Sequence, residues 1–174
     1  MKRHLRRVYV KMNSQNNAVN LLNNDPLAKE LLQSNILVRM AYTGTDGFPR
    51  VVPLGFYWDS TQFYVCTATN APKVRALETN PKVAMTIDTN TQPPHVLLVR
   101  GTARLEIVDG VPLEFLKASH KYIEPQSWPE FDTQARALYK QMARIAILPE
   151  WAKLLDFETR LPSAIEALAG KRQG

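Results

Sequence analysis

The stretch Cys66-Thr67-Ala68-Thr69-Asn70-Ala71-Pro72-Lys73-Val74-Arg75-Ala76-Leu77 joins a predicted strand to a predicted helix. Apart from one cysteine, residues 63–67 are β-branched or aromatic, and this composition favours a strand. Small and polar residues follow, and Pro72 is typical of the first turn of a helix. The sequence therefore predicts a strand that ends at Thr67 and turns almost at once into a helix.

This junction is a candidate anion site. Unpaired amide groups and the positive end of the helix dipole point outward where a helix begins. Thr67, Lys73 and Arg75 would add one hydroxyl group and two positive charges. The same residues also fit a solvent-exposed helix start with two surface cations, and this stretch alone favours that simpler interpretation.

Length and composition predict one globular domain. The chain has 174 residues, of which 45% are hydrophobic and 22% charged, which is ordinary for a folded protein in water. No segment approaches the roughly 20 consecutive apolar residues of a membrane helix, so we expect no membrane partner. Cys66 is the only cysteine and cannot form an internal disulfide, which favours a reducing, cytoplasmic location.

The net charge of +6 is concentrated at the two ends of the chain. The positive charges of residues 1–11 and 171–172 together exceed the whole net charge, so the body of the chain is close to neutral. We therefore expect no nucleic-acid partner. The predicted organisation is a disordered basic and polar tail over 1–24, one domain over 25–160, and a C-terminal tail over 161–174 that is irregular or a short helix.

The hydrophobic pattern predicts a mainly β protein with helical additions. We expect helices over 25–32, 72–79, 113–123 and 131–142, and strands over 36–43, 50–58, 62–67, 82–88, 96–107, 145–148 and 151–157. Pro149 should separate the last two strands into a closing hairpin. The sequence Asp46-Gly47 is typical of a tight hairpin turn, and Gly101 suggests a bulge or a close backbone approach. This order predicts a small antiparallel barrel.

With these elements placed, the chain resembles the FMN-binding split β-barrel family, whose best-known member is pyridoxamine 5′-phosphate oxidase. The resemblance covers roughly residues 27–157. It rests on Gly47-Phe48-Pro49-Arg50-Val51-Val52-Pro53, on Thr67 followed six residues later by Lys73, on Asn80-Pro81-Lys82-Val83-Ala84 and on Val99-Arg100-Gly101-Thr102-Ala103. No single motif is specific to this family, but the four motifs together, in this order and each on the expected element, are.

The resemblance implies a flavoprotein that forms a homodimer, with two flavin sites between the subunits. It places Arg50 and the backbone of Val51, Val52 and Pro53 beside the flavin. It assigns the flavin phosphate to Thr67, Lys73 and Arg75. The implied cofactor is FMN, with a deazaflavin as the alternative.

We expect no catalytic side chain and no metal site in this chain. Hydride and electron chemistry would belong to the flavin, so a protein nucleophile is not required. The three histidines lack cysteine partners and carboxylate spacing for a metal, and His120 is expected to pack or to cap a helix. Cys66 is expected to fill a small apolar space.

The chain departs from the oxidases at two places that concern the substrate. The Arg-x-His element near the oxidase C-terminus is absent from Phe157-Glu158-Thr159-Arg160-Leu161-Pro162-Ser163, and Val96 stands where oxidases often have a flavin-contacting glutamine. We therefore do not expect vitamin B6 oxidation. Trp128 and Phe131 either cover the outer face of the flavin ring or fix a loop to the core.

Three functions remain open from the sequence. The first is an FMN-dependent oxidoreductase that acts on a small organic substrate. The second is a deazaflavin-dependent reductase, which would need further cations for a longer anionic tail, with Arg39 and Arg100 as the candidates. The third is a non-catalytic protein that binds flavin or haem, because a fold does not fix a function.

Overall fold

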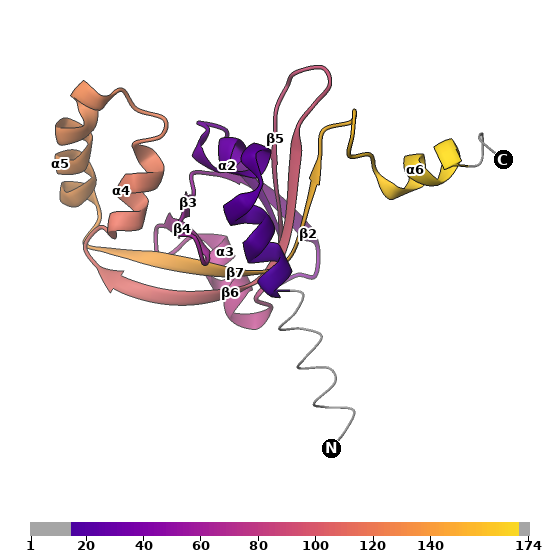
Figure 1. The fold of residues 1–174 in the computed structure, drawn as a ribbon. Helices are drawn as coiled ribbons and strands as arrows, with labels where there is room; N and C mark the ends of the chain where they lie inside the picture. The colour runs from indigo at the N-terminus through magenta and orange to yellow at the C-terminus, as the bar shows by residue number, and fades with distance from the viewer. Residues whose placement is uncertain (1–14, 171–174) are drawn as a thin grey trace.

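The computed structural model describes residues 15–170 (Figure 1). Their centre is a seven-stranded antiparallel sheet with the strand order β2-β1-β5-β6-β7-β4-β3. The elements are α2 (Pro26–Gln33), β1 (Val38–Thr43), β2 (Pro49–Leu54), β3 (Tyr57–Trp58), β4 (Phe63–Thr67), α3 (Pro72–Thr79), β5 (Lys82–Asp88), β6 (Val96–Asp109), α4 (Leu113–Ser119), the 3₁₀ helix η1 (Pro125–Ser127), α5 (Trp128–Leu138), β7 (Gln141–Leu155) and α6 (Ser163–Gly170). The predicted fold class, a mainly β split barrel with helical additions, is confirmed.

The sheet closes on itself because β2 and β3 are joined by only two residues. β2 pairs with β1 at one edge of the sheet, whereas β3 pairs with β4 at the other edge. Only Gly55 and Phe56 lie between Leu54 and Tyr57, and a chain spans at most about 3.6 Å per residue, so the two edges come within roughly 11 Å of each other. The predicted single strand over 50–58 is therefore wrong, since the chain changes edges at its middle.

The long strands β6 and β7 form a continuous antiparallel pair along their whole length. The register shifts where Arg100 faces Trp151 and Gly101 faces Pro149, which leaves Glu150 as the extra residue of a bulge. The predicted closing hairpin is therefore wrong. A proline is tolerated within a strand at a bulge, so β7 continues through Pro149. The bulge expected at Gly101 is confirmed.

The helices after β6 also differ from the prediction. The expected helix over 131–142 ends at Leu138, and Met142 is a fully buried residue of β7 instead. The expected helix over 113–123 ends at Ser119. After Ser119 the chain forms turns and a bend over residues 120–123. Beyond Leu138, strand pairing with β6 captures residues from Gln141 onward, although the segment carries apolar residues at helical spacing. Tertiary pairing therefore overrides the local pattern.

The hairpin between β1 and β2 has the predicted turn. Gly47 has φ = +83°, a conformation that glycine adopts without the penalty paid by other residues. The Gly47 amide donates to the Gly44 carbonyl oxygen at 2.9 Å, and the Gly44 amide donates to the Phe48 carbonyl oxygen at 2.8 Å. The Asp46-Gly47 signal is confirmed.

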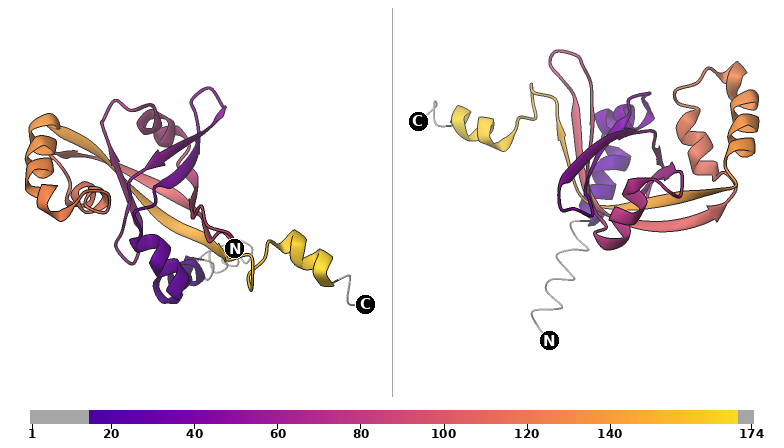
Figure 2. Two further views of the ribbon diagram at one scale, coloured as in Figure 1. Left: turned by 90° about the horizontal axis from the view of Figure 1, so that it is seen from above. Right: turned by 180° about the vertical axis from the view of Figure 1, so that it is seen from behind.

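One main apolar core fills the barrel and extends under the helices on both sides. Figure 1 shows α2 at the front, and the view from behind in Figure 2 shows α3 at the front, so these helices cover opposite sides. The largest fully buried side chains of this core are Leu22, Leu31, Val38, Met40, Phe56, Phe63, Val65, Ile87, Leu97, Ile145 and Ile147, whereas Met142 belongs to a second, smaller cluster. Burying each large side chain contributes about 1.5–3 kcal/mol, so this core supplies the main stabilisation.

Residues 15–24 are helical, against the expectation of a disordered tail over 1–24. Ala18 and Leu22 lie four residues apart and are buried in the structure. Asparagine is a poor helix former, so packing of this apolar face stabilises the helix more than local propensity does. The basic segment over 1–11 and the last residues, 171–174, lie outside the described part. Within residues 15–170, no helix is long and apolar enough to cross a membrane.

Asp25 fixes the start of α2 and also connects it to the C-terminal part of the chain. One carboxylate oxygen accepts hydrogen bonds from the amides of Leu27, at 2.9 Å, and Ala28, at 3.2 Å. The other lies 2.9 Å from a guanidinium nitrogen of Arg160. Burial acts to raise the pKa of Asp25, but the hydrogen bonds from Arg160 and Ala28 outweigh it, so its pKa lies below the usual value.

We expect Asp25→Ala to lower the free energy of unfolding by about 1–2 kcal/mol at neutral pH, because it removes an N-cap and one partner of an ion pair. The folded-state pKa is depressed, so this stabilisation is present above the unfolded-state pKa of about 3.9 and is lost as the pH falls through the folded value. Urea unfolding of both proteins at neutral and acidic pH measures the difference. Asp25→Asn keeps the N-cap, so its free energy of unfolding should fall less than that of Asp25→Ala. An equal decrease in both variants would contradict the capping role.

Candidate functional site

Thr67 and Lys73, two of the residues expected to hold the flavin phosphate, lie close together in the structure. Thr67 is the last residue of β4, and Lys73 lies in the first turn of α3. The Lys73 ammonium donates to the Thr67 hydroxyl at 3.5 Å. The four residues between strand and helix form a tight connection, in which the Ala71 amide donates to the Ala68 carbonyl oxygen at 3.1 Å. The connection thus brings a hydroxyl group and an ammonium group to one place.

The Lys73 ammonium is a half-buried cation without a counter-charge. Burial lowers the pKa of Lys73, and no carboxylate pairs with it within residues 15–170. A partly desolvated cation favours an anionic partner, which would offset the cost of its burial. The site therefore fits a phosphate group.

Arg75 does not join this pair. It is exposed on α3, two residues after Lys73, and residues two apart point to different sides of a helix. Among the described residues its guanidinium group has no hydrogen bond to Thr67 or Lys73. Its place in the phosphate site stays a prediction.

Arg50, Val51, Val52 and Pro53 form most of the edge strand β2. One side of β2 pairs with β1, and its other side has no strand partner within residues 15–170. Backbone groups along an unpaired edge are available to a ligand, and Pro53 is compatible with this position because it needs no ladder partner. Helix α3, which carries Lys73, packs against β1, the strand that pairs with β2.

The Arg50 side chain is held within its own hairpin. Its two terminal nitrogens lie 2.9 Å and 2.8 Å from the carboxylate oxygens of Asp46. The hydrogen bonds from Arg50 lower the pKa of Asp46 to about 2. Arg50 also donates to the Phe48 carbonyl oxygen at 3.1 Å. The guanidinium group therefore stiffens the turn that precedes β2, and the structure does not bring it to Thr67 or Lys73.

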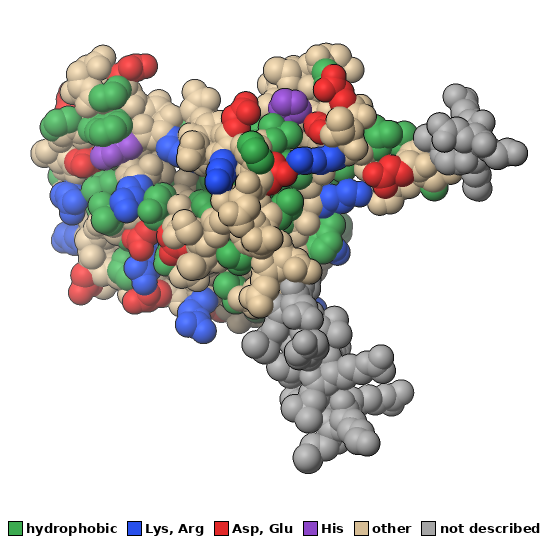
Figure 3. Space-filling model, in the orientation of Figure 1, with side chains coloured by type: hydrophobic (Ala, Val, Ile, Leu, Met, Phe, Trp, Pro, Cys, Tyr) green, Lys and Arg blue, Asp and Glu red, His purple; other side chains and the backbone are tan. Residues whose placement is uncertain are grey.

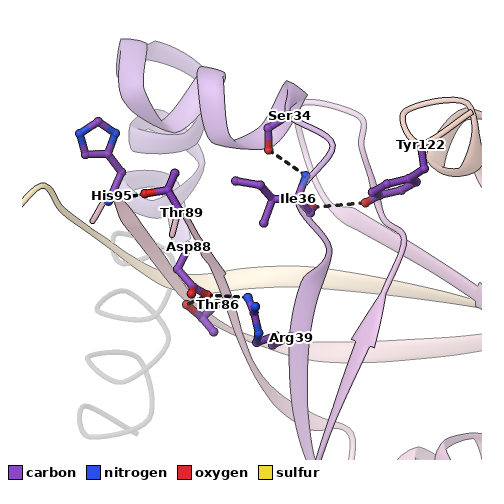
Figure 4. A network of polar contacts seen from close by, with 8 residues as sticks. All are labelled: Ser34, Ile36, Arg39, Thr86, Asp88, Thr89, His95 and Tyr122. Atoms are coloured by element: carbon purple, nitrogen blue, oxygen red, sulfur yellow. Dashed lines mark hydrogen bonds and ion pairs between the residues drawn. The ribbon is translucent and has the colours of Figure 1, made fainter. Parts of the chain in front are cut away.

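The two extra cations considered for a longer anionic ligand already have partners. Arg39 on β1 forms a 2.8 Å ion pair with Asp88 on β5, as Figure 4 shows. Arg100 on β6 lies over the ring of Trp151, 4.1 Å from its centre. Either cation would have to leave or share its present contact to bind a ligand.

The fold buries the Cys66 thiol and disfavours its ionisation. Burial, with a contribution from the Glu114 carboxylate, raises the pKa of its thiol to about 12, so the thiol stays protonated. The side chain lines a small cavity of about 230 Å³ beside Phe115 and Phe131. This place agrees with the packing role expected for it.

His120, Trp128 and Phe131 pack within the helical part of the molecule. The rings of His120 and Trp128 are stacked, with their centres 4.3 Å apart, and His120 Nε2 lies 2.8 Å from a carboxylate oxygen of Asp132. Phe131 stacks on Phe115, 6.1 Å between ring centres. Among residues 15–170, no group of three or more metal-ligating side chains comes together.

A family model named pyridoxamine 5′-phosphate oxidase matches residues 25–149 of the chain. The chain therefore belongs to this family, as its motifs indicated. No curated protein matches the chain significantly.

Solved structures share the same fold. An F420 reductase is 27% identical with a TM-score of 0.58, and the match covers 72% of this chain and 94% of that one. HutZ, the haem storage protein from Vibrio cholerae, is 19% identical with a TM-score of 0.54, and the match covers 76% of this chain and 93% of HutZ. General Stress Protein 26 from Bacillus anthracis is 19% identical with a TM-score of 0.53, and the match covers 76% of this chain and 95% of that protein. The last two likenesses show the fold alone.

Sequence reasoning missed a second cluster of charged residues, formed by Lys29, Lys117 and Lys121 around a separate cavity. Lys117 and Lys121 lie four residues apart, a spacing that would place them on one face of a continuous helix. Lys29 comes from a distant part of the sequence, and no local pattern connects it with the other two.

Proposed function

We propose that the protein is an FMN-binding oxidoreductase in which Thr67 and Lys73 hold the phosphate of the flavin. The observation that carries this proposal is the 3.5 Å contact between the Thr67 hydroxyl and the half-buried Lys73 ammonium, which has no carboxylate partner among residues 15–170. A charge-assisted contact of this kind is about twice as strong as a neutral hydrogen bond. Membership of the pyridoxamine 5′-phosphate oxidase family supports the choice of a flavin as the anion.

The flavin ring would lie along the edge strand β2. There the backbone of Val51, Val52 and Pro53 would orient the polar edge of the ring, and Arg50 would hold the strand in place through its Asp46 ion pair. The bound flavin would supply hydride and electron transfer. The protein would contribute binding, orientation and exclusion of water, consistent with a Cys66 thiol that stays protonated.

A second copy of the chain would complete this site. Apolar side chains stand out near β2 and at the far ends of β6 and α5: Phe48 is 71% exposed, Val51 63%, Ile107 46% and Leu138 71%. Burial of these side chains against a second copy would favour association. No residue of β2 lines the cavities of about 660, 230, 610 and 730 Å³ found among residues 15–170, and a second chain beside β2 would supply the missing wall. We therefore propose a homodimer with the flavin between the subunits.

A deazaflavin is the second candidate cofactor. The 27% identity with an F420 reductase favours it, since F420 is a deazaflavin. The ion pair of Arg39 with Asp88 argues for the shorter FMN, because this cation is already partnered. Non-catalytic binding of flavin or haem is the remaining alternative, and anaerobic reduction of the loaded protein distinguishes it from catalysis.

Anaerobic reduction of the protein loaded with FMN tests the proposed activity. We expect reduced nicotinamide, or another hydride donor in a panel, to bleach the flavin, and a small organic acceptor to restore its colour. Bound FMN that no donor reduces would indicate a carrier. Reduction of deazaflavin without any binding of FMN would favour the second cofactor.

A further inference from the structure

A cavity of about 660 Å³ lies outside the proposed flavin site. Residues 15–24 and α2 line one side, α4 and the start of α5 line the other, and β3 lines the bottom. Figure 3 shows this side of the molecule, where a histidine and several lysine or arginine side chains lie among hydrophobic ones. The volume falls within the range of small-molecule sites. None of the residues proposed to hold the flavin lines it.

Two half-buried tryptophans give the cavity rigid aromatic surfaces. The indole nitrogen of Trp58 donates to the side-chain oxygen of Asn23 at 3.0 Å, and that of Trp128 donates to the Ile123 carbonyl oxygen at 3.0 Å. Trp128 is further held by its stack on His120. Both rings are thus fixed before any ligand arrives, which reduces the entropy cost of binding a flat ligand against them.

The charged groups that line the cavity are all basic. Among the residues that the structure describes, three lysines and one histidine belong to the lining, and no aspartate or glutamate does. The Lys117 ammonium donates to the Tyr57 hydroxyl at 3.2 Å, and the Lys121 ammonium donates to the Leu32 carbonyl oxygen at 3.0 Å. An ammonium group has three donors, so each of these two retains donors for a ligand. The lining therefore favours a negatively charged group.

Lys121 is the most deeply placed of the three lysines. It lies over the ring of Phe56, 3.5 Å from the ring centre, and burial lowers its pKa to about 8. Among residues 15–170 no acidic side chain lines the cavity to offset its charge, and the carboxylate of Asp132 is hydrogen-bonded to His120. An anion in the cavity would compensate this charge.

We propose that this cavity binds a small planar aromatic carboxylate, with its ring against the two indoles and its carboxylate at Lys117 and Lys121. Lys117 and Lys121 each retain donors, so each ammonium group would donate to one carboxylate oxygen as a point charge. The site is separate from the flavin phosphate, and its occupancy does not depend on the proposed cofactor.

Titration with 2-naphthoate tests this site, since Trp58 and Trp128 report on it through their fluorescence. We expect 2-naphthoate to bind at least tenfold more tightly than the neutral 2-naphthamide. This difference in affinity corresponds to about one charge-assisted hydrogen bond. Lys117→Gln should weaken 2-naphthoate about fivefold and leave 2-naphthamide unchanged. This lysine is exposed on α4, so the variant is expected to fold.

Two control variants separate this site from the rest of the molecule. Lys82→Gln, at an exposed position of β5 outside the lining, should leave 2-naphthoate affinity unchanged, and so should Lys73→Ala. Absence of 2-naphthoate binding, equal affinity for the amide, or an unchanged affinity in Lys117→Gln would overturn the proposal. An equal loss in Lys82→Gln would also overturn it, because it would show only a general effect of net charge.

Discussion

Replacing Lys73 with alanine is expected to weaken FMN binding by about ten- to a hundredfold. The variant loses a charge-assisted contact with the phosphate, worth about 1.5–3 kcal/mol. The half-buried ammonium has the Thr67 hydroxyl as its partner at 3.5 Å and no carboxylate within the described chain, so no protein anion competes with the phosphate. Quenching of flavin fluorescence during titration measures the affinity.

Riboflavin and a second lysine provide the controls for this experiment. Riboflavin lacks the phosphate, so its affinity should be the same in the native protein and in Lys73→Ala. Lys82→Ala removes an equal charge from an exposed position of β5 and should bind FMN as the native protein does. An unchanged FMN affinity in Lys73→Ala would show that the phosphate lies elsewhere.

Replacing Gly101 with alanine is expected to destabilise the fold by about 3 kcal/mol, the upper end of the usual cost of overpacking. A Cβ at this position would overlap the carbonyl oxygen of Leu148 and crowd the side chain of Ile147 at 3.1 Å. The obstacle is backbone of the neighbouring strand β7 at the bulge, so it cannot move without disturbing the central pair of strands. Thermal unfolding should show a midpoint lowered by roughly 6–12 °C.

Gly55→Ala is the matched control. Its new Cβ would lie 3.3 Å from the side chain of Tyr122, which can move by a few tenths of an ångström, and in ordinary contact with Ala118 at 3.9 Å. We expect a clearly smaller loss of stability than in Gly101→Ala. Equal midpoints for Gly101→Ala and the native protein would mean that β6 and β7 do not meet closely at the bulge.

The sequence was informative where one local signal determines the structure. The Asp46-Gly47 turn and the strand that ends at Thr67 are both found as expected, because each depends on residues adjacent in the chain. Gly101 was also interpretable from its place in an apolar strand. The proximity of Thr67 and Lys73 follows from the same principle, since only five residues separate them.

The errors have a common physical cause, which is pairing between distant residues. Pro149 ends a strand by local rules, yet β7 continues because the bulge opposite Gly101 accommodates it. The helix over 15–24 is rich in asparagine and is stabilised by burial of Leu22 in the main core. In the cavity of about 660 Å³, Lys29 lies far in sequence from Lys117 and Lys121, so no short stretch of sequence contains all three lysines.

The flavin content of the purified protein tests the central claim most directly. We expect the protein to be yellow as isolated, or to take up FMN to one molecule per chain, with the flavin held at Thr67 and Lys73. Absorbance and flavin fluorescence after removal of free cofactor measure this ratio. A protein that stays colourless and takes up neither FMN nor a deazaflavin would contradict the assignment of a flavin phosphate to this site.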